Sequence, residues 1–361
     1  MKLLFVVDSF GGGAGNVIQI LANAFAEKGN DASVLLLNGK RVESKYDLSK
    51  INVIDYPLGK YAKGHTPVDR IYKSVKAIRK QFDSIQPDVI ISFLTELNIL
   101  CCMANKKNIP LIVSERNDPA KDNVKKYWKL LRNKYYKKAD RVVVQCSNFK
   151  EFAGGRFKEN CSVIPNPILE PAAVRSGYEL HSPVRLISLG RLQAQKNFKW
   201  MIDRMEELKA INNNFVLSIY GSGVLKDELD EYIKQKGLQD HVKLAGYAVD
   251  TYSALAESDI YLMTSDYEGF PNALSEAMAV GLPSVSRLCH EGIRDLVQDG
   301  TNGFLVEKDQ CQLFVERILS LCQDHQLYSL IGKSAKDVAC TFSVERIVSM
   351  WKQEIDRCMG K

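Results

Sequence analysis

The sequence lacks the patterns of a disulfide-bonded or membrane-spanning protein. Its nine cysteines are scattered and include no C-x-x-C pair, so neither a zinc site nor a redox motif is indicated. Reduced thiols are typical of cytoplasmic proteins. The apolar run after Lys2 is too short for a signal peptide, and no run approaches the roughly 20 residues of a membrane-spanning helix. We expect a cytoplasmic protein, able to meet the inner face of the cell membrane only peripherally.

Several catalytic signatures are missing as well. The sequence has no G-x-S-x-G elbow, no H-E-x-x-H motif and no D-x-D motif. Without D-x-D, a nucleotide diphosphate held through a metal ion is disfavoured, so we expect neither a metal nor a cofactor. The glycine-rich run 11–15 has Asn16 where a dinucleotide fingerprint needs Gly or Ala, which argues against a nicotinamide cofactor.

What the sequence does have is charge of opposite sign in its two halves. The 361 residues are enough for about two domains of ~150 residues each. Residues 1–165 hold 28 Lys and Arg against 16 Asp and Glu, a net charge of +12, whereas the remainder holds 21 against 27, a net charge of −6. This difference suggests two domains with different partners, the basic one facing nucleic acid, an anionic membrane or an anionic substrate.

Short apolar runs alternate with helical periods along the whole chain, which predicts buried parallel strands. The alternation restarts after Ile164-Pro165-Asn166-Pro167. We therefore expect two α/β domains, 1–165 and 166–342, each with a parallel sheet. An amphipathic tail, 343–361, predicts a final helix. The expected strands are Leu3-Val7, Val34-Leu37, Val89-Phe93, Leu111-Val113, Val142-Val144, Leu186-Leu189, Val216-Tyr220, Ile260-Met263 and Ser284-Val285.

Two carboxylates flank one predicted strand-to-helix junction in the second half. Glu268 follows the strand 260–263, and Glu276 lies in the first turns of an apolar helix. A carboxylate among apolar residues suggests a specific role for Glu276. Glu276 has no Ser or Thr three residues earlier to form a capping box, but it can accept hydroxyl hydrogen bonds from a sugar. The backbone N–H groups between them suit a phosphate. The intervening residues that we expect at the donor are Gly269, Phe270, Pro271 and Asn272, and all but the proline have a backbone N–H.

Two cations follow the first predicted strand of the second half. Arg191 and Lys196 come after the run 186–189, so they lie at the same sheet edge as Glu268. Arginine binds phosphate as a fork and lysine as a point charge, so together they suit a diphosphate.

In this combination the sequence resembles glycosyltransferase family 4, the retaining GT-B enzymes. Glu268 and Glu276 are separated by seven residues and preceded by Gly190-Arg191 and Lys196, as in that family. The segment 164–167 is similar to the family's domain junction, and 299–305 to its late turn and strand. The resemblance implies two Rossmann-like domains facing across a cleft, the C-terminal one binding a nucleotide sugar and the N-terminal one an acceptor. It also implies that the last helix crosses back to the first domain.

The resemblance also implies roles for individual residues. Glu276 would hold the ribose hydroxyls, Glu268 those of the donor sugar, and Arg191 with Lys196 the diphosphate. Glu268, Arg191 and Lys196 form the expected catalytic set. Gly12, Gly13 and Gly221 match glycine turns that approach the donor, and Tyr247 falls near the base pocket. The chain departs from the family after Gly13, where it lacks a Glu-Arg pair, and at 114–119, where some members have a histidine. There we expect Arg116 or Asn117 on the acceptor side.

The implied function is a retaining transfer of sugar from a nucleotide sugar, UDP favoured over GDP, to a glycan or polyprenyl-diphosphate-linked acceptor in cell-surface polysaccharide biosynthesis. Transfer onto the face that the leaving group vacates requires stabilisation of the departing diphosphate, which the two cations supply. Two alternatives stay open. One is a GT-B sugar-nucleotide epimerase, and the other is a non-catalytic protein that binds a membrane or nucleic acid.

The densest basic segment is 121–141, with four interleaved aromatic residues. Val124, Trp128, Leu131 and Tyr135 share one predicted helix face. One interpretation is a core-facing stripe with lysines in solvent, and the other is a helix that docks on anionic lipid. No nucleic-acid-binding motif accompanies the segment, so we expect no nucleic-acid partner. Its basic residues are Lys121, Lys125, Lys126, Lys129, Arg132, Lys134, Lys137, Lys138 and Arg141.

Overall fold

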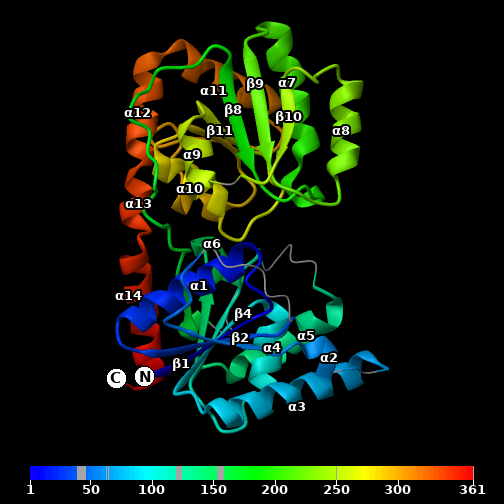
Figure 1. The fold of residues 1–361 in the computed structure, drawn as a ribbon, viewed down its shortest axis with the longest axis vertical. Helices are drawn as coiled ribbons and strands as arrows, with labels where there is room; N and C mark the ends of the chain where they lie inside the picture. Colours follow the sequence, from blue (N-terminus) through cyan, green and yellow to red (C-terminus); the bar gives the residue numbers. More distant parts are fainter. Residues whose placement is uncertain are drawn as a thin grey trace. The chain divides into compact units, whose positions relative to one another are not determined.

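The protein consists of two compact α/β units (Figure 1). The computed structural model describes residues 1–38, 46–61, 63, 65–118, 124–152, 158–248 and 250–360. Unit 1 contains Met1–Pro167 and Val344–Lys361, and unit 2 contains Ile168–Ser343. These divisions lie within two residues of the sequence boundaries at 165 and 342.

Unit 1 is built on a parallel sheet of seven strands in the order β3-β2-β1-β4-β5-β6-β7. Its central strands are mostly apolar and almost entirely buried, which explains why the sequence pattern predicted them clearly. The strands are β1 Lys2–Val7, β2 Asp31–Leu36, β3 Asn52–Asp55, β4 Val89–Phe93, β5 Leu111–Ser114, β6 Arg141–Val144 and β7 Cys161–Val163. The helices are α1 Gly12–Glu27, α2 Leu58–Tyr61, α3 Pro67–Ile85, α4 Thr95–Ala104, α5 Lys126–Tyr135 and α6 Ser147–Phe152, with 3-10 turns at Tyr136–Lys138 and Lys158–Asn160.

The last helix, α14 (Val344–Cys358), belongs to unit 1, as predicted. Trp351 is fully buried and stacks on Phe93 of β4 with ring centroids 5.8 Å apart. Arg141 Nε of β6 donates to Glu354 Oε2 at 2.5 Å, so an ion pair joins α14 to the sheet. The chain therefore returns to its first unit after completing the second.

Unit 2 repeats the design with six parallel strands in the order β10-β9-β8-β11-β12-β13. One continuous core of buried apolar side chains fills the space between its sheet and helices. The strands are β8 Val184–Leu189, β9 Phe215–Tyr220, β10 Val242–Gly246, β11 Ile260–Met263, β12 Ser284–Arg287 and β13 Phe304–Val306. The helices are α7 Phe198–Ile211, α8 Lys226–Gln235, α9 Thr251–Ala256, α10 Asn272–Val280, α11 Cys311–Gln323, α12 His325–Ala335 and α13 Asp337–Thr341, with 3-10 turns at Ala194–Lys196 and Glu291–Asp295.

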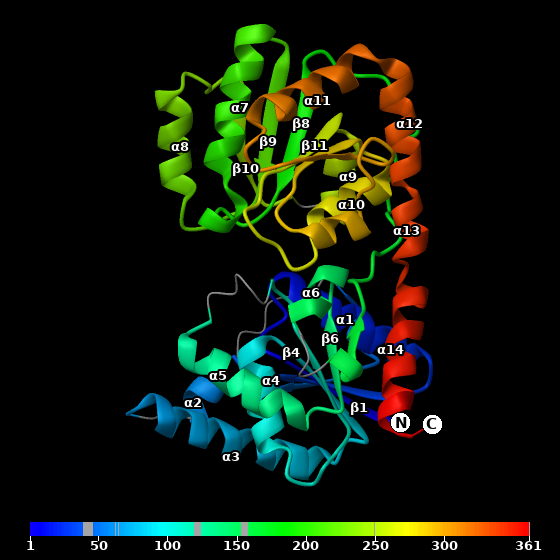
Figure 2. The ribbon, with the colours of Figure 1, turned by 180° about the vertical axis from the view of Figure 1, so that it is seen from behind.

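The basic segment 121–141 packs differently from the predicted stripe; residues 121–123 lie outside the described part. Figure 2 shows α3, α4 and α5 lying side by side on unit 1. Trp128 and Arg132 are the buried residues of α5, and Tyr136 continues their spacing. Leu131 and Tyr135, predicted to face the core, are only partly buried, so that expectation was wrong in part. The cause is a carboxylate that draws Arg132 inward, described below.

Candidate active site

The candidate donor site of unit 2 lies where the sheet's connections reverse direction. From β8 the chain runs outward to β9 and β10, then returns to place β11 on the other side of β8. Ligands of such sheets bind outside the carboxyl ends of the strands at this reversal. The two segments that leave these strand ends are 190–197, after β8, and 264–271, after β11. They contain Arg191, Lys196 and Glu268.

An ion pair connects the two segments. Lys196 Nζ lies 2.7 Å from Glu268 Oε1, and Ser265 Oγ donates to the same oxygen at 2.6 Å. Glu268 is 7% exposed, so water screens the pair only weakly. The two bonds end on Oε1, which leaves Oε2 to accept hydrogen bonds from a ligand hydroxyl. Sequence reasoning did not identify Ser265, although its place three residues before Glu268 was visible.

Glu276 lies near the same centre, on α10. Glu276 and Glu268 both interact electrostatically with Tyr261, a buried residue of β11. Burial raises the pKa of the Tyr261 phenol, and the negative charges of Glu268 and Glu276 raise that pKa further. Since such interactions fade with distance, both predicted carboxylates lie in the neighbourhood of Tyr261.

Glycines let the loops at this edge approach one another closely. The side chain of Lys196 lies over Gly190, where an added Cβ would come within 2.8 Å of the lysine Cε. Gly221, after β9, has φ +147° and would place a Cβ 1.8 Å from the Gly190 carbonyl oxygen. Gly221 therefore supports the loop that carries Arg191. Its predicted contact with a donor stays a prediction.

A second set of contacts holds the segment 264–271 in place. Asp266 Oδ1 accepts from Arg287 Nη1 at 2.7 Å and from Asn197 Nδ2 at 3.2 Å. Gln195 Nε2 donates to the Tyr267 carbonyl at 2.8 Å. Sequence reasoning missed Asp266 and Arg287, but Arg287 is the last residue of β12, so its position at a strand's carboxyl end was an available signal.

The other predicted donor residues of unit 2 differ in exposure. Arg191 is exposed, and its side chain forms no hydrogen bond or ion pair with any described residue, so its guanidinium is available to an anion. Tyr247 is 80% exposed at the end of β10, and its hydroxyl accepts from Ser222 Oγ at 2.6 Å. Phe270 instead is buried against Phe342 at 5.7 Å, so only its backbone is suited to a ligand. Gly269 and Pro271 are buried and Asn272 partly buried at the start of α10.

In unit 1 the glycine loop follows β1. Gly12 and Gly13 are exposed at the start of α1, and Gly12 has φ +75° with open space around its Cβ position. The adjacent Gly15 serves packing, since a Cβ there would lie 2.4 Å from the Phe10 carbonyl carbon. Gly15 thus allows the close packing of the turn, whereas Gly12 and Gly13 present an accessible backbone.

At the end of β5 the two predicted acceptor-side residues separate. Asn117 is exposed, whereas Arg116 is buried, with its guanidinium carbon 3.9 Å from the centre of the Phe93 ring. The preceding Glu115 is buried too and accepts from Tyr136 Oη at 2.6 Å, with Arg132 Nη1 at 3.7 Å. This carboxylate is what turns Arg132 inward on α5.

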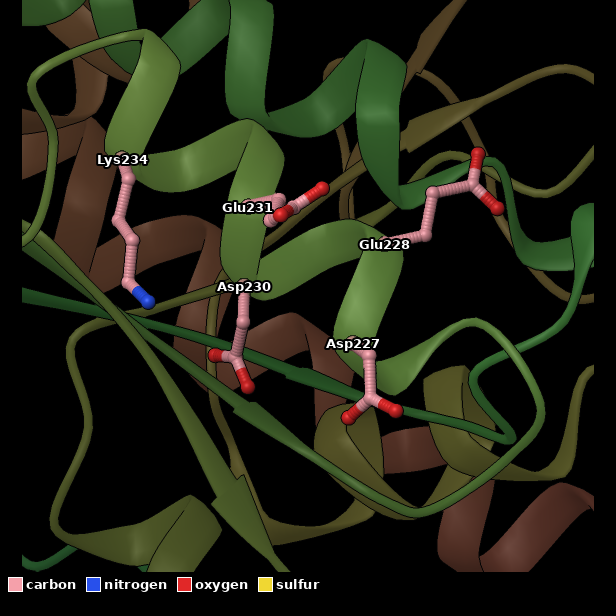
Figure 3. Close-up of a pocket in the computed structure, with 5 residues that line it drawn as sticks. All are labelled: Asp227, Glu228, Asp230, Glu231 and Lys234. Atoms are coloured by element: carbon pink, nitrogen blue, oxygen red, sulfur yellow. The ribbon is translucent and has the colours of Figure 1, made fainter.

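Two surface hollows of unit 2 contain no residue of the segments 190–197 and 264–271 in their lining. Asp227, Glu228, Asp230, Glu231 and Lys234 line one hollow on α8, and their side chains fan out along the helix (Figure 3). An excess of carboxylates repels an anionic nucleotide. A neighbouring hollow lies against β9 and β10 beside Asp240 and His241. The chemistry therefore favours the ends of β8 and β11.

Neither a metal cluster nor a membrane span emerges from the described residues. Within the described ranges, no three His, Cys, Asp or Glu side chains gather as metal ligands. Among the same residues, no helix has both the length and the apolar character needed to cross a bilayer.

Two family models match the chain and together cover both units. The model for Glycosyltransferase Family 4 matches residues 11–168, and the model for Glycosyl transferases group 1 matches residues 177–338. The chain is 26% identical over 357 residues, 97% of each chain, to a *Campylobacter jejuni* enzyme. That enzyme is named GalNAc-alpha-(1->4)-GalNAc-alpha-(1->3)-diNAcBac-PP-undecaprenol alpha-1,4-N-acetyl-D-galactosaminyltransferase. A putative colanic acid biosynthesis glycosyltransferase of *Salmonella typhimurium* is 34% identical over 46% of this chain and 43% of its own.

Solved structures share the fold over almost the whole chain. The crystal structure of *Anabaena* HepE with UDP and glucose superimposes with a TM-score of 0.83, at 21% identity and 99% coverage of each chain. *Staphylococcus aureus* TarM, with fondaparinux, alpha-GlcNAc-glycerol and UDP, gives a TM-score of 0.81 at 16% identity, covering 99% of this chain and all of that one.

Proposed function

Since this chain belongs to glycosyltransferase family 4, we propose that it is a retaining enzyme that transfers a sugar from a UDP-sugar to a lipid-linked glycan. Membership makes it a glycosyltransferase with two Rossmann-like domains of the GT-B class. The names of its relatives, which act on undecaprenol-linked glycans or in colanic acid synthesis, support polysaccharide or lipid-linked glycan biosynthesis.

The pair between Lys196 and Glu268 is the observation that carries the proposal. It places a cation and a carboxylate 2.7 Å apart at the reversal of the sheet, with exposed Arg191 on the same loop. Glu268 Oε2 accepts hydroxyls of the donor sugar, while Lys196 and Arg191 stabilise the charge that develops on the departing diphosphate. Glu276 binds the ribose hydroxyls.

The new bond forms on the face from which the diphosphate leaves. A phosphate oxygen of the leaving group is close to that face and takes the acceptor's proton, so no protein base is required. Gly12 and Gly13, and the backbone at 269–272, offer N–H groups to the phosphates. The acceptor binds to unit 1, where Asn117 is exposed at the end of β5.

The deciding experiment is a screen of UDP- and GDP-sugars against a polyprenyl-diphosphate-linked glycan, with mass detection. Lys196→Ala and Glu276→Ala should each lower transfer about 100-fold, because loss of one preorganised contact to a developing charge costs about 3 kcal/mol. Lys199→Ala is the matched control, since Lys199 pairs with Glu228 on the outer helices. Native rates in both site variants would refute the assignment.

The same assay separates the alternatives. Retention appears as an unchanged anomeric configuration in the product's NMR spectrum. An epimerase would convert the nucleotide sugar without any acceptor, and a non-catalytic protein would bind UDP without turnover.

We also propose that transfer needs no metal ion, since the two cations and the helix-terminal N–H groups supply the positive charge at the diphosphate. Transfer should be unchanged when EDTA is added to the assay. A rate that disappears with EDTA and returns with Mg²⁺ or Mn²⁺ would contradict this.

A further inference from the structure

Arg116, just after β5, is a buried cation that forms no ion pair with any described residue. The residue is 6% exposed, and within the described ranges none of its three guanidinium nitrogens has a hydrogen-bond partner. Its contact with the Phe93 ring, at 3.9 Å, offers only the electron-rich face of an aromatic ring. Buried guanidinium groups are normally paired with anions, so this site is incomplete.

The adjacent carboxylate is already engaged elsewhere. Glu115 accepts from Thr95 Oγ1 at 2.7 Å and from Tyr136 Oη at 2.6 Å, and Arg132 lies 3.7 Å away. Two hydroxyl donors, from α4 and the 3-10 turn, and the Arg132 cation of α5 therefore share Glu115. The cation that pairs with the Glu115 carboxylate is Arg132, not Arg116.

The buried guanidinium of Arg116 stays positively charged, so the unfavourable free energy of burying a charge remains. Burial lowers the pKa of the Arg116 guanidinium to about 9. A group with that pKa is still protonated at neutral pH. Since a buried charge without a partner is unfavourable and a ring contact offsets only part of the cost, an anion from outside the chain would stabilise this arrangement.

We propose that Arg116 is the arginine of an anion site that binds the diphosphate of a substrate. The planar guanidinium offers two parallel N–H groups that match phosphate oxygens. The Ser114 hydroxyl, at the last position of β5, is a second donor, since it too is buried and has no hydrogen-bond partner in the part of the chain that the structure describes. Asn117 is exposed, so the segment reaches the surface at the ligand-binding edge of the sheet.

Two diphosphates are available under the proposed function, that of the nucleotide donor and that of a polyprenyl-linked acceptor. The anion site itself rests on the geometry of unit 1 and not on that function. Calorimetry on the full chain with UDP, and with inorganic pyrophosphate at saturating UDP, distinguishes the two sources. Arg116→Met keeps the side chain's length and apolar contact but removes its charge.

We expect Arg116→Met to weaken the binding of one of these ligands at least tenfold. A loss for pyrophosphate identifies the acceptor's diphosphate, and a loss for UDP identifies the donor's. Arg70→Met, which removes an exposed arginine of α3, is the matched control and should bind both ligands as the native chain does. Arg116→Lys keeps the positive charge but loses the two parallel N–H groups, so its affinity should lie between those of the native chain and Arg116→Met. It replaces Arg116→Met as the test if the methionine variant does not fold.

The proposal is overturned if Arg116→Met or Arg116→Lys binds both ligands with native affinity. A lowered unfolding temperature with unchanged affinities would make Arg116 a packing residue on Phe93. If the native chain fails to bind UDP, the proposed donor function fails. In that case the binding of pyrophosphate is measured in the absence of UDP, with the native chain and with the Arg116 variants. If the native chain does not bind pyrophosphate either, the proposal is overturned.

Discussion

Gly221 shows how a single missing Cβ holds two loops together. Its Cβ would lie 1.8 Å from the carbonyl oxygen of Gly190, and its φ of +147° is unfavourable for any other residue. Gly221→Ala should lower the free energy of unfolding by about 3 kcal/mol, because overpacking adds to backbone strain. It should also weaken UDP binding, since the loop that carries Arg191 must shift. Urea unfolding and calorimetry measure the two effects.

Gly237→Ala separates backbone strain from the clash. Gly237 also has a positive φ, +63°, but open space surrounds its Cβ position. We expect a loss of about 1 kcal/mol with unchanged UDP binding. Equal effects of the two substitutions would mean that the contact with Gly190 does not matter.

At the scale of elements, the segment between β11 and α10 is held by a side chain from the neighbouring strand. Arg287 of β12 donates to Asp266 at 2.7 Å, two residues before Glu268. Arg287→Met should cost only about 1 kcal/mol of unfolding free energy, because the Asp266 carboxylate is half-exposed. It should lower kcat/KM for the donor about tenfold, since small displacements of a catalytic group slow transfer strongly.

Arg294→Met provides the control for this prediction. Arg294 is an exposed arginine of the same unit that pairs with Glu291 and Glu307. Its loss should leave donor kinetics unchanged. If both arginine variants behave alike in kinetics and unfolding, Arg287 does not position Glu268.

The sequence predicted the elements whose patterns come from burial on both faces. The central strands are mostly apolar runs and were predicted. The edge strands β3, β7 and β10 are partly exposed and were missed, because their mixed patterns carry little signal. The Glu268 and Glu276 spacing was visible in the sequence, as was the placement of Lys196. The Arg287 contact and the burial of Arg132 by Glu115 depend on residues distant in sequence, which local periodicity does not report.

At the scale of the whole molecule, the charge difference between the halves suggests different anionic partners for the two units. Unit 2 binds its proposed anionic donor with a few local cations, despite the net −6 of residues 166–361. In unit 1, Lys126 and Lys134 of α5 and the two lysines of the turn after it are exposed, whereas Trp128 and Arg132 are buried. Leu130, 72% exposed among them, adds an apolar side chain to a basic surface. This combination is typical of a surface that docks on anionic lipid.

We therefore predict that the protein sediments with anionic liposomes and not with neutral ones. Replacing Lys126, Lys134 and Lys137 with Gln should weaken this binding roughly 100-fold, because each lysine near an anionic surface contributes about 1 kcal/mol. The control replaces exposed Lys226, Lys234 and Lys243 of unit 2 and should bind like the native chain. Transfer to a soluble acceptor analogue should be unchanged in both variants, since neither set touches the donor site. Equal sedimentation with anionic and neutral liposomes would show that this basic surface serves solubility and that the lipid-linked acceptor is recruited without it.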